Sequence, residues 1–451
     1  MAKNYIIRCK NINNDFYGSF SFNNAVFEAA GLLPGEKASV NLLYGKDKGR
    51  AEVVEILEPS PERVEPPCSA YGKCGGCRFL HTNYKNELRL KTEVVKNLLE
   101  RYGEVMPCLG MGKDSFHYRN KVHSTLSLDR KGRVISGLYE ETTHKLIDIE
   151  SCAIETPAAA KVMKTIRKFM NDFHLAPYNE DSRKGTLRHV LFRTSKTGDT
   201  LVVPVCGCRI FPEKKKLAEA IMKEHPFVKS VVLNYNTKKT SFVLGDRDEI
   251  LTGPGYITDS LCGITFRISP HSFYQVNTVM AEKIYADAVK LSGIGSNDTI
   301  LDAYCGIGTI AAAVAKMTGA KEITGVELNP AAVKDARESA ESNNLGNLRF
   351  AEDDAADFLN AALGAEVRYS CIIMDPPRSG ASEDFLSAVK RMSPQKLIYI
   401  SCNPLTLARD MRTLAVSGYK AKYIRPYDMF PHTGNVEVLV ILEKAASLKD
   451  S

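Results

Sequence analysis

The chain has 451 residues, which at roughly 150 residues per domain predicts about three domains. Hydrophobic residues make up 44% and charged residues 25% of the sequence, and these values exclude collagen-like, low-complexity and wholly disordered proteins. No run of 18 or more apolar residues is present, and the first residues, MAKNYIIRCK, lack the pattern of a secretory signal. We therefore expect a soluble, cytoplasmic protein that does not enter a membrane.

The charge and the cysteine content narrow the functional classes. Lys and Arg number 60 against 53 Asp and Glu, so the net charge is +7, a mild excess that permits nucleic-acid binding. The sequence also contains 12 cysteines. Because the cytosol keeps thiols reduced, clustered cysteines are expected to be metal ligands or nucleophiles and not disulfide partners.

The N-terminal residues predict a small all-β module. Short apolar stretches in residues 1–60 are broken by turn sequences such as LPGE at residues 33–36. Prolines at positions 59, 61, 66 and 67 then crowd one stretch, which is typical of a domain edge.

Three thiols cluster directly after this edge. The sequence CSAYGKCGGC contains Cys68, Cys74 and Cys77, and Cys152 follows 75 residues after Cys77. Such a set suits an iron–sulfur cluster or zinc, and the spacing does not choose between them. Cys206 and Cys208 form a weaker candidate pair, better explained as two alternating positions of a strand.

The middle of the chain mixes helical and strand patterns. Apolar periodicity predicts a helix over residues 83–102, and residues 113–256 indicate an α+β domain. The strands predicted there are 201–205, 231–234 and 240–244. Basic residues without an intervening acid indicate either a solvated strand face or a track for RNA: Arg183, Lys184, Arg188, His189, Arg193 and Lys196.

From residue 259 onward, apolar strands alternate with helices. The predicted strands are 299–303, 322–326, 370–374 and 396–400, and the helices that follow them are 309–317, 331–342, 383–392 and 405–416. This alternation is typical of a doubly wound α/β sheet. Two further strands, in GYKAKYIRPYDMF and NVEVLVILE, have no helix between them. We predict that they form an antiparallel hairpin which closes an otherwise parallel sheet.

The turn after the first of these strands has the form of a nucleotide-binding loop. Residues 304–311 read YCGIGTIA, and the two glycines let backbone N–H groups approach a ligand. Glu327 ends the next strand, 19 residues after Gly308, where a carboxylate can bind ribose hydroxyls. These features predict a nucleoside-bearing cofactor but do not separate NAD from S-adenosylmethionine.

Three later residues end or begin strands at the same predicted edge. Asp375 precedes two prolines, which hold the backbone in an extended form without N–H donors. Such a segment is typical of enzymes that methylate planar amines or bases and has no use in a dehydrogenase. Cys402 precedes a helix capped by Asn403, and we expect the helix dipole to lower the pKa of its thiol. Glu437 opens the last strand, where it can face Cys402 as a candidate base.

Five motifs occur together and in order: FYQVN (273–277), LDAYCGIGT (301–309), DPPRSG (375–380), SCNP (401–404) and PHTGNVE (431–437). With them the sequence resembles the RNA uracil-5 methyltransferases, and more closely their 23S rRNA branch, over nearly the whole chain. The resemblance implies a Rossmann-like domain that uses S-adenosylmethionine.

The resemblance also implies roles for individual residues. Cys402 would be the nucleophile that adds to C6 of uracil, so that C5 attacks the methyl group, and Glu437 would be the base that removes the C5 proton. The residues implied to bind S-adenosylmethionine are Gln275, Tyr304, Glu327 and Asp375. Asn435 departs from the pattern, because many relatives have histidine two residues before the base.

The same resemblance extends to the N-terminal half. The CxxxxxCGGC pattern with a distant fourth cysteine implies a 4Fe-4S cluster on Cys68, Cys74, Cys77 and Cys152. Residues 1–60 resemble the TRAM module, a small OB-like β-barrel associated with RNA binding. The expected chain is thus multidomain: the barrel (1–60), an α+β central domain with the iron–sulfur site (61–258) and the methyltransferase domain (259–451).

The resulting hypothesis is a monomeric enzyme that makes 5-methyluridine in 23S rRNA. The target uridine has to be unpaired or flipped out, because C5 and C6 are stacked inside a helix. One alternative is the same chemistry on the T-loop uridine of tRNA. Others are a redox enzyme that combines the cluster with a dinucleotide, and a catalytically dead RNA-binding protein, which the presence of Cys402, Asp375 and Glu437 argues against.

Overall fold

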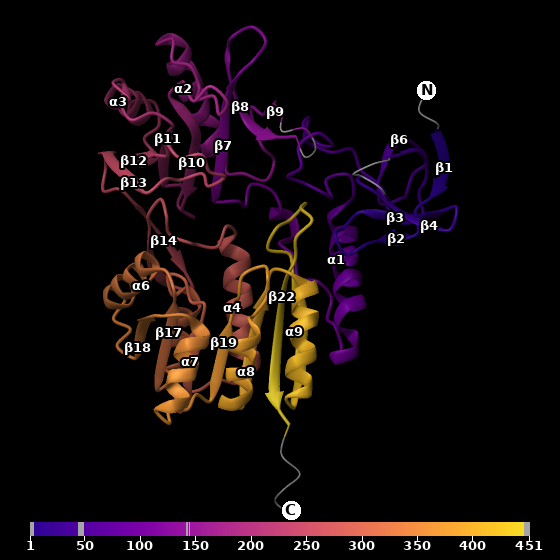
Figure 1. The fold of residues 1–451 in the computed structure, drawn as a ribbon, viewed down its shortest axis with the longest axis vertical. Helices are drawn as coiled ribbons and strands as arrows, with labels where there is room; N and C mark the ends of the chain where they lie inside the picture. Colours follow the sequence, from indigo (N-terminus) through magenta and orange to yellow (C-terminus); the bar gives the residue numbers. More distant parts are fainter. Residues whose placement is uncertain (1–3, 44–48, 141–142, 144, 446–451) are drawn as a thin grey trace, which may run out of the picture.

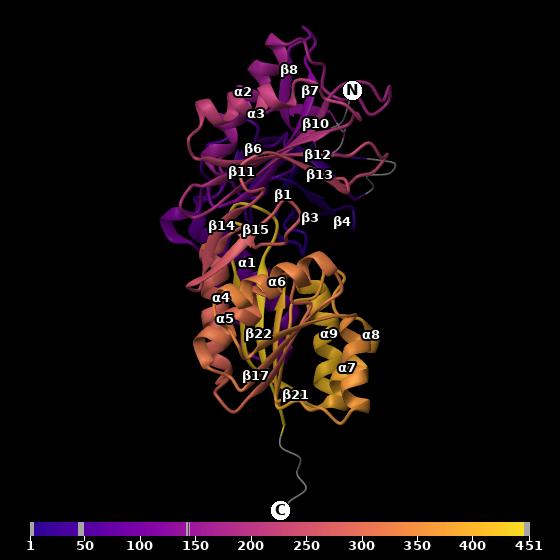
Figure 2. The same ribbon diagram turned by 90° about the vertical axis from the view of Figure 1, so that its left-hand side faces the viewer.

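The computed structural model describes residues 4–43, 49–140, 143 and 145–445. Figure 1 shows an N-terminal β region, a central α+β region and a C-terminal sheet flanked by helices, with the C-terminal sheet at the bottom of the view. In the perpendicular view of Figure 2 the central region lies above the C-terminal one.

The N-terminal region is all-β, as predicted. Its strands are β1 (Asn4–Arg8), β2 (Asn11–Ile12), β3 (Gly18–Phe22), β4 (Ala25–Ala29), β5 (Lys37–Leu42) and β6 (Ala51–Glu58). They form two antiparallel three-stranded sheets, in the orders β1-β5-β6 and β2-β3-β4. Phe20, Leu32 and Val40 lie in the small core of this region.

The segment after β6 has a different character. Residues 59–83, which we call the cysteine loop, form no helix and no extended strand. Helix α1 (Tyr84–Leu99) follows, with the Asn83 side chain accepting a hydrogen bond from the Asn86 N–H, and the 3-10 turns η2 (Glu100–Tyr102) and η3 (Gly112–Asp114) come next. The helix predicted at 83–102 is therefore confirmed.

Helix α1 belongs to the core of the C-terminal sheet, although it precedes the central region in sequence. Leu90, Val94 and Val95 are buried in the same apolar cluster as Ile424 and Val440. Figure 1 shows α1 alongside α9. The site described below therefore draws on residues from both ends of the chain.

The central region is a seven-stranded sheet in the order β13-β12-β11-β10-β7-β8-β9. Its strands are β7 (Lys121–Leu128), β8 (Val134–Tyr139), β9 (Leu146–Asp148), β10 (Leu187–Thr194), β11 (Thr200–Cys206), β12 (Val228–Tyr235) and β13 (Arg247–Thr252). Helices α2 (Pro157–Asp172) and α3 (Lys214–Glu224) pack on it. The strand predicted at 240–244 is wrong, because the Asn236 side chain donates to the Phe242 and Val243 carbonyls and holds this segment as a loop.

The basic set of the central region does not form one exposed face. Arg188 and Arg193 are each only 2% exposed, because β10 lies in the middle of the sheet. Arg193 donates to the Pro270 and Ser272 carbonyls, and Arg188 pairs with Glu180. Two of the six basic residues thus have structural partners, which contradicts a continuous RNA track along this strand.

A hairpin of β14 (Ile257–Leu261) and β15 (Ile264–Ile268) leads into the C-terminal region. There the strands are β16 (Thr299–Ala303), β17 (Glu322–Glu327), β18 (Leu348–Glu352), β19 (Cys371–Met374), β20 (Lys396–Ser401), β21 (Tyr419–Tyr427) and β22 (Glu437–Lys444). The helices are α4 (Thr278–Ser292), α5 (Thr309–Thr318), α6 (Pro330–Ser342), α7 (Ala355–Gly364), α8 (Glu383–Met392) and α9 (Pro404–Val416).

The topology of this sheet confirms the predicted α/β arrangement. The strand order is β18-β17-β16-β19-β20-β22-β21, with the first five strands parallel and β22 antiparallel to both of its neighbours. All four residues of β19 are buried, as expected for a strand covered by helices on both faces. The hairpin of β21 and β22 closes the sheet as predicted, whereas β18 and α7 were not among the predicted elements.

Candidate active site

A cavity of about 790 Å³ lies at the carboxyl ends of the parallel strands, the edge where open α/β sheets bind ligands. All six residues singled out in the C-terminal region line it: Gln275, Tyr304, Glu327, Asp375, Cys402 and Glu437. These side chains come from five different strand ends and one loop, so strand topology is what brings them together.

The loop between β16 and α5 shapes one wall of this cavity. Tyr304, Gly306 and Gly308 all have left-handed backbone conformations, with φ values of 64°, 56° and 77°. A Cβ atom on Gly308 would lie 2.5 Å from Cζ of Phe350, so this position requires glycine. The Glu327 carboxylate accepts hydrogen bonds from the Gly306 N–H at 3.1 Å and the Asn329 N–H at 2.8 Å. The turn and the carboxylate are thereby held in one fixed arrangement.

The cavity concentrates acidic groups. Burial, together with the charges of Asp375 and Glu327, raises the pKa of Asp302 to about 8 against the opposing effect of a hydrogen bond from the Ala311 N–H. Burial also raises the pKa of Asp375 to about 7. A cationic ligand in this cavity would be stabilised, because it offsets the repulsion among these carboxylates. The positively charged sulfur of S-adenosylmethionine fits such a site.

Cys402 and Glu437 lie next to each other, as the hairpin predicts. Ser401 of β20 pairs with Val438 of β22, so the residues one step beyond this pair are neighbours at the sheet edge. Glu437 is only 4% exposed and does not end its strand in solvent. Burial, followed by the charge of Asp375, raises the pKa of Glu437 well above its usual value, against the opposing effect of Arg378.

The expected pKa shift of Cys402 is wrong in direction. Cys402 does stand between β20 and the N-terminus of α9, where the Asn403 side chain accepts from the Leu405 N–H. However, burial and the charges of Glu437 and Asp375 raise the pKa of the thiol to about 12, and only Arg378 provides an opposing positive charge. In the protein alone, the acidic neighbours therefore outweigh the helix dipole.

A second cavity, of about 430 Å³, is also lined by Cys402. Cys402 and Arg378 line both cavities, and the remaining walls of the second come from the start of α9, the N-terminal region, the cysteine loop, α1 and the segment just before Glu437. Tyr17 carries two guanidinium groups over its ring, with Cζ of Arg78 at 4.1 Å and Cζ of Arg50 at 5.5 Å from the ring centre. The sequence motifs did not identify these three residues, because they become neighbours only in the folded chain.

The four candidate cluster ligands lie near one another. Burial raises the pKa of the Cys77 thiol, and the charges of Cys152, Cys74 and Cys68 raise it further. Cys68 and Cys152 also line one shallow pocket with Phe116 and His117. In the part of the chain that the structure describes, no three His, Cys, Asp or Glu side chains are arranged as ligands of a single metal ion. The tertiary fold thus brings the distant Cys152 near the three cysteines that are already close together in sequence.

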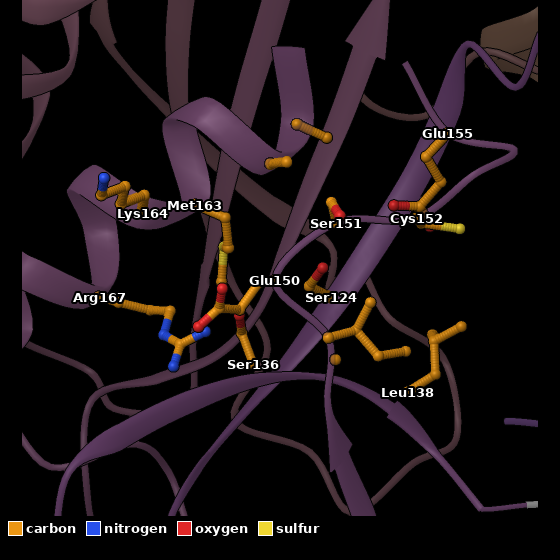
Figure 3. Close-up of a pocket in the computed structure, with 14 residues that line it drawn as sticks. Ser124, Ser136, Leu138, Glu150, Ser151, Cys152, Glu155, Met163, Lys164 and Arg167 are labelled. Atoms are coloured by element: carbon orange, nitrogen blue, oxygen red, sulfur yellow. The ribbon is translucent and has the colours of Figure 1, made fainter. Parts of the chain in front are cut away.

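Another pocket, of about 350 Å³, lies behind Cys152 in the central region. Figure 3 shows Met163, Lys164 and Arg167 on one side of it and Ser151, Cys152 and Glu155 on the other. Arg167 is already engaged by Asp148. This pocket contains none of the residues from the C-terminal motifs, so the strand-edge cavity is the better candidate for catalysis.

Comparison with known proteins decides the family. The family described as tRNA (uracil-5-)-methyltransferase matches residues 83–445. The chain belongs to this family of RNA uracil-5 methyltransferases. An uncharacterized RNA methyltransferase of Halalkalibacterium halodurans is 39% identical over 91% of this chain and 90% of its own length. Another uncharacterized RNA methyltransferase, from Clostridium tetani, is 35% identical over 94% of this chain and 93% of its own length.

A solved structure shows the same fold for this methyltransferase. The crystal structure of Pyrococcus abyssi tRNA (uracil-54, C5)-methyltransferase in complex with S-adenosyl-L-homocysteine matches with a TM-score of 0.77 and 24% identity. The match covers 98% of this chain and 100% of the other. None of the described helices has the length and apolar composition needed to cross a membrane.

Proposed function

We propose that the protein transfers a methyl group from S-adenosylmethionine to C5 of a uridine in 23S rRNA. The observation that carries the proposal is the pairing of Cys402 with Glu437 at the strand-edge cavity, beside a nucleoside-type loop. The 23S rRNA assignment rests on the resemblance described above. A second candidate substrate is the T-loop uridine of tRNA, favoured by the family description and by the solved structure from Pyrococcus abyssi.

Four residues of the first cavity would hold the cofactor: Gln275, Tyr304, Glu327 and Asp375. S-adenosylmethionine, when bound, supplies a methyl group on a positively charged sulfur. The Glu327 carboxylate, fixed by the Gly306 and Asn329 N–H groups, is placed to accept from ribose hydroxyls. The acidic surroundings of Asp375 favour the positive charge.

Cys402 would act as the nucleophile. Its thiolate forms a bond to C6 of uracil, and the electron pair of the C5–C6 double bond moves into an enolate. C5 then bonds to the methyl group as the methyl–sulfur bond breaks. Arg378 is the positive charge beside Cys402 that favours the thiolate, and a cationic ligand in the first cavity lowers the pKa of the thiol further.

Glu437 would complete the reaction as the base. It takes the proton from C5, the C5–C6 double bond forms again, and the Cys402–C6 bond breaks to release the thiolate and 5-methyluridine. The raised pKa of Glu437 suits this role, because a carboxylate that holds a proton more tightly is a stronger base.

The second cavity would admit the target nucleotide. It shares Cys402 with the cofactor cavity, and Arg50, Arg78 and Arg378 lie along it. Guanidinium groups bind phosphate, and an aromatic ring such as Tyr17 supports them. The N-terminal region would serve as the TRAM-type RNA-binding module.

The four clustered cysteines would bind a 4Fe-4S cluster: Cys68, Cys74, Cys77 and Cys152. Four thiolates are the usual ligand set of such a cluster. The cysteine loop contains no named helix or strand, so a cluster would supply cross-links that regular secondary structure does not provide there.

Methyl transfer to purified RNA tests the substrate. Labelled S-adenosylmethionine is incubated with the enzyme and separated, unmodified 23S rRNA, 16S rRNA or tRNA, and the nucleosides are analysed by mass spectrometry. We expect 5-methyluridine in 23S rRNA and none with Cys402→Ala protein. Product in tRNA alone would establish the second candidate, and the absence of product in all three RNAs would overturn the proposed activity.

Trapping of the covalent adduct tests the mechanism. Glu437→Gln protein should form the Cys402–RNA bond and transfer the methyl group but release product very slowly, on the order of 10²–10⁴-fold below wild type. The adduct is expected as a shifted band on a denaturing gel. If no adduct accumulates, Glu437 is not the base.

A further inference from the structure

A buried charged cluster lies beneath the loop that leads to Glu437. We call it the His432 network; its members are Glu87 and Lys91 of α1, and Asp428 and His432 of the β21–β22 loop. The side chains of Glu87 and Lys91 have no exposed surface, and that of His432 is 4% exposed. Lys91 Nζ lies 2.8 Å from Glu87 Oε1 and 2.6 Å from Asp428 Oδ1.

The charged groups of the His432 network stabilise one another in their charged forms. Burial opposes the charged form of Lys91, but Asp428 and Glu87 overcome it and raise the pKa of the amine. Burial likewise opposes the charged form of Glu87, but Lys91 and His432 lower its pKa. Burying such groups is costly unless they are well paired, and removing one partner leaves the others uncompensated. None of these groups lines either cavity.

His432 is held through both its backbone and its ring. Its N–H donates to Glu87 Oε1 at 2.7 Å, and its carbonyl accepts from the N–H groups of Arg78 at 2.7 Å and Phe79 at 3.0 Å. Its ring atoms Nδ1 and Nε2 lie 3.2 Å from Glu87 Oε2 and from Ser115 Oγ, respectively. These contacts hold His432 in a left-handed conformation with φ of 66°, which is unfavourable for a residue other than glycine.

These contacts determine where the loop before Glu437 lies. Lys91 fixes its beginning at Asp428, and Glu87 fixes its middle at His432, five residues before the base. Tyr118 adds a hydrogen bond to the Pro431 carbonyl at 3.1 Å. Cys402, in contrast, is positioned by β20 and α9, which do not contact the network through any of these bonds.

We propose that Glu87 and His432 are positioning residues that hold the β21–β22 loop so that the Glu437 carboxylate reaches the C5 proton of the methylated adduct. Through the bonds from Arg78 and Phe79, the same residues link this base to the loop that carries Cys77. This inference rests on the proposed function. It predicts a defect confined to proton removal, because adduct formation and methyl transfer depend on Cys402.

Kinetics of Glu87→Gln and His432→Asn proteins test the proposal. Gln keeps the acceptor for the His432 N–H but removes the charge that faces Lys91 and the ring, and Asn tolerates the left-handed conformation. We expect kcat to fall about 10–100-fold with KM for RNA nearly unchanged, since small displacements of a reacting group cost rates of this order. The covalent adduct should accumulate, and a primary isotope effect should appear with RNA deuterated at uridine C5.

The matched control is Glu93→Gln, a change on α1 at an exposed glutamate that pairs with Arg89. It should leave all three readouts unchanged. A lower kcat without adduct accumulation or isotope effect would mean a merely structural role and would overturn the proposal, as would an unchanged kcat. If thermal unfolding shows that the Glu87→Gln protein is not folded, the kinetics of the His432→Asn protein test the proposal. Failure of the wild type to form adduct or product would instead refute the proposed function.

Discussion

The two regions that meet at Cys402 are built in different ways. The C-terminal sheet edge is made of strand ends, and its reactive residues are placed by backbone pairing, as Ser401 and Val438 show. The cysteine loop has no named helix or strand and is held by side-chain and loop contacts, such as the ion pair of Arg63 with Glu36 at 2.5 Å. It contacts the C-terminal region through the His432 carbonyl.

This difference predicts which amino-acid substitutions each region tolerates. Strand pairing is distributed over many backbone bonds, so a side chain at the sheet edge can be replaced without moving its neighbours. Loop geometry depends on a few side chains, so losing one of them moves the backbone around it. Substitutions of side chains that line the cavity at the sheet edge, such as Cys402, should therefore change the reaction but not stability, whereas substitutions in the cysteine loop should change both.

The largest effect is expected at the sheet edge. Cys402→Ala should lower methyl transfer on the order of 10⁴-fold or more and abolish the adduct, because it removes the thiol that lines both the cofactor cavity and the second cavity. Affinity for S-adenosylmethionine by calorimetry and the melting temperature should stay close to wild type. Cys262→Ala, at a half-buried cysteine outside both cavities, is the control. Retained turnover in Cys402→Ala would exclude the thiol as nucleophile.

The cysteine loop should give a mixed effect. Cys77→Ser is expected to reduce bound iron, from on the order of four atoms per chain in anaerobically purified protein, and to lower the melting temperature. Activity should fall about tenfold or more, because Arg78 and Phe79, the next residues, bind the His432 carbonyl. Iron analysis, thermal unfolding and the methyl-transfer assay measure the three quantities. Zinc in place of iron would refute the cluster, and an unchanged melting temperature would refute the comparison.

A smaller effect is expected from Arg378, which lines both cavities. Arg378 lowers the pKa of Cys402, so Arg378→Gln should raise that pKa and reduce the thiolate fraction at neutral pH. The rate should fall about three- to tenfold at pH 7 and recover as the pH rises, which a pH–rate profile would detect. Arg412→Gln, at an exposed position of α9, should leave the profile in place. A loss that is equal at all pH values would contradict the electrostatic role.

The last prediction concerns stability and leaves the reaction aside. Because the pKa of Asp302 is about 8 in the folded protein against 3.8 ordinarily, the folded state retains a proton that the unfolded state releases. Its contribution to stability is therefore greatest below about pH 4 and is lost as the pH rises to about 8. Asp302→Asn should weaken this dependence, on the order of a few kcal/mol over the range, in denaturant titrations at several pH values. An unaltered pH dependence would show that Asp302 is not protonated in the native state.

Much of the C-terminal region could be predicted because its signals are local. Asn329 and Pro330 mark the start of α6, and Asn403 and Pro404 mark the start of α9, so the strand ends carrying Glu327 and Cys402 could be located. The sheet edge then follows from the rule that parallel strands share one carboxyl edge. The strand predicted at 240–244 failed because alternating apolar residues also occur in loops held by a side chain such as Asn236.

Other features of the site had no local signal. The direction of the Cys402 pKa shift was wrong because the helix N-terminus is visible in sequence, whereas burial beside Glu437 and Asp375 is not. The cavity formed with Tyr17 was missed because its walls come from segments that are far apart in the sequence.

By itself the sequence determined the α/β order of the C-terminal sheet, the family and the candidate residues at the strand ends, because these depend on periodicity, caps and short motifs. Only the tertiary structure decided which charges surround Cys402, how the cysteine loop contacts the β21–β22 loop, and that Lys91 pairs with Asp428. That pair is separated by 337 residues. Contacts of this kind arise from the packing of whole regions, and burial, which sets the strength of their electrostatics, is a property of the packed molecule.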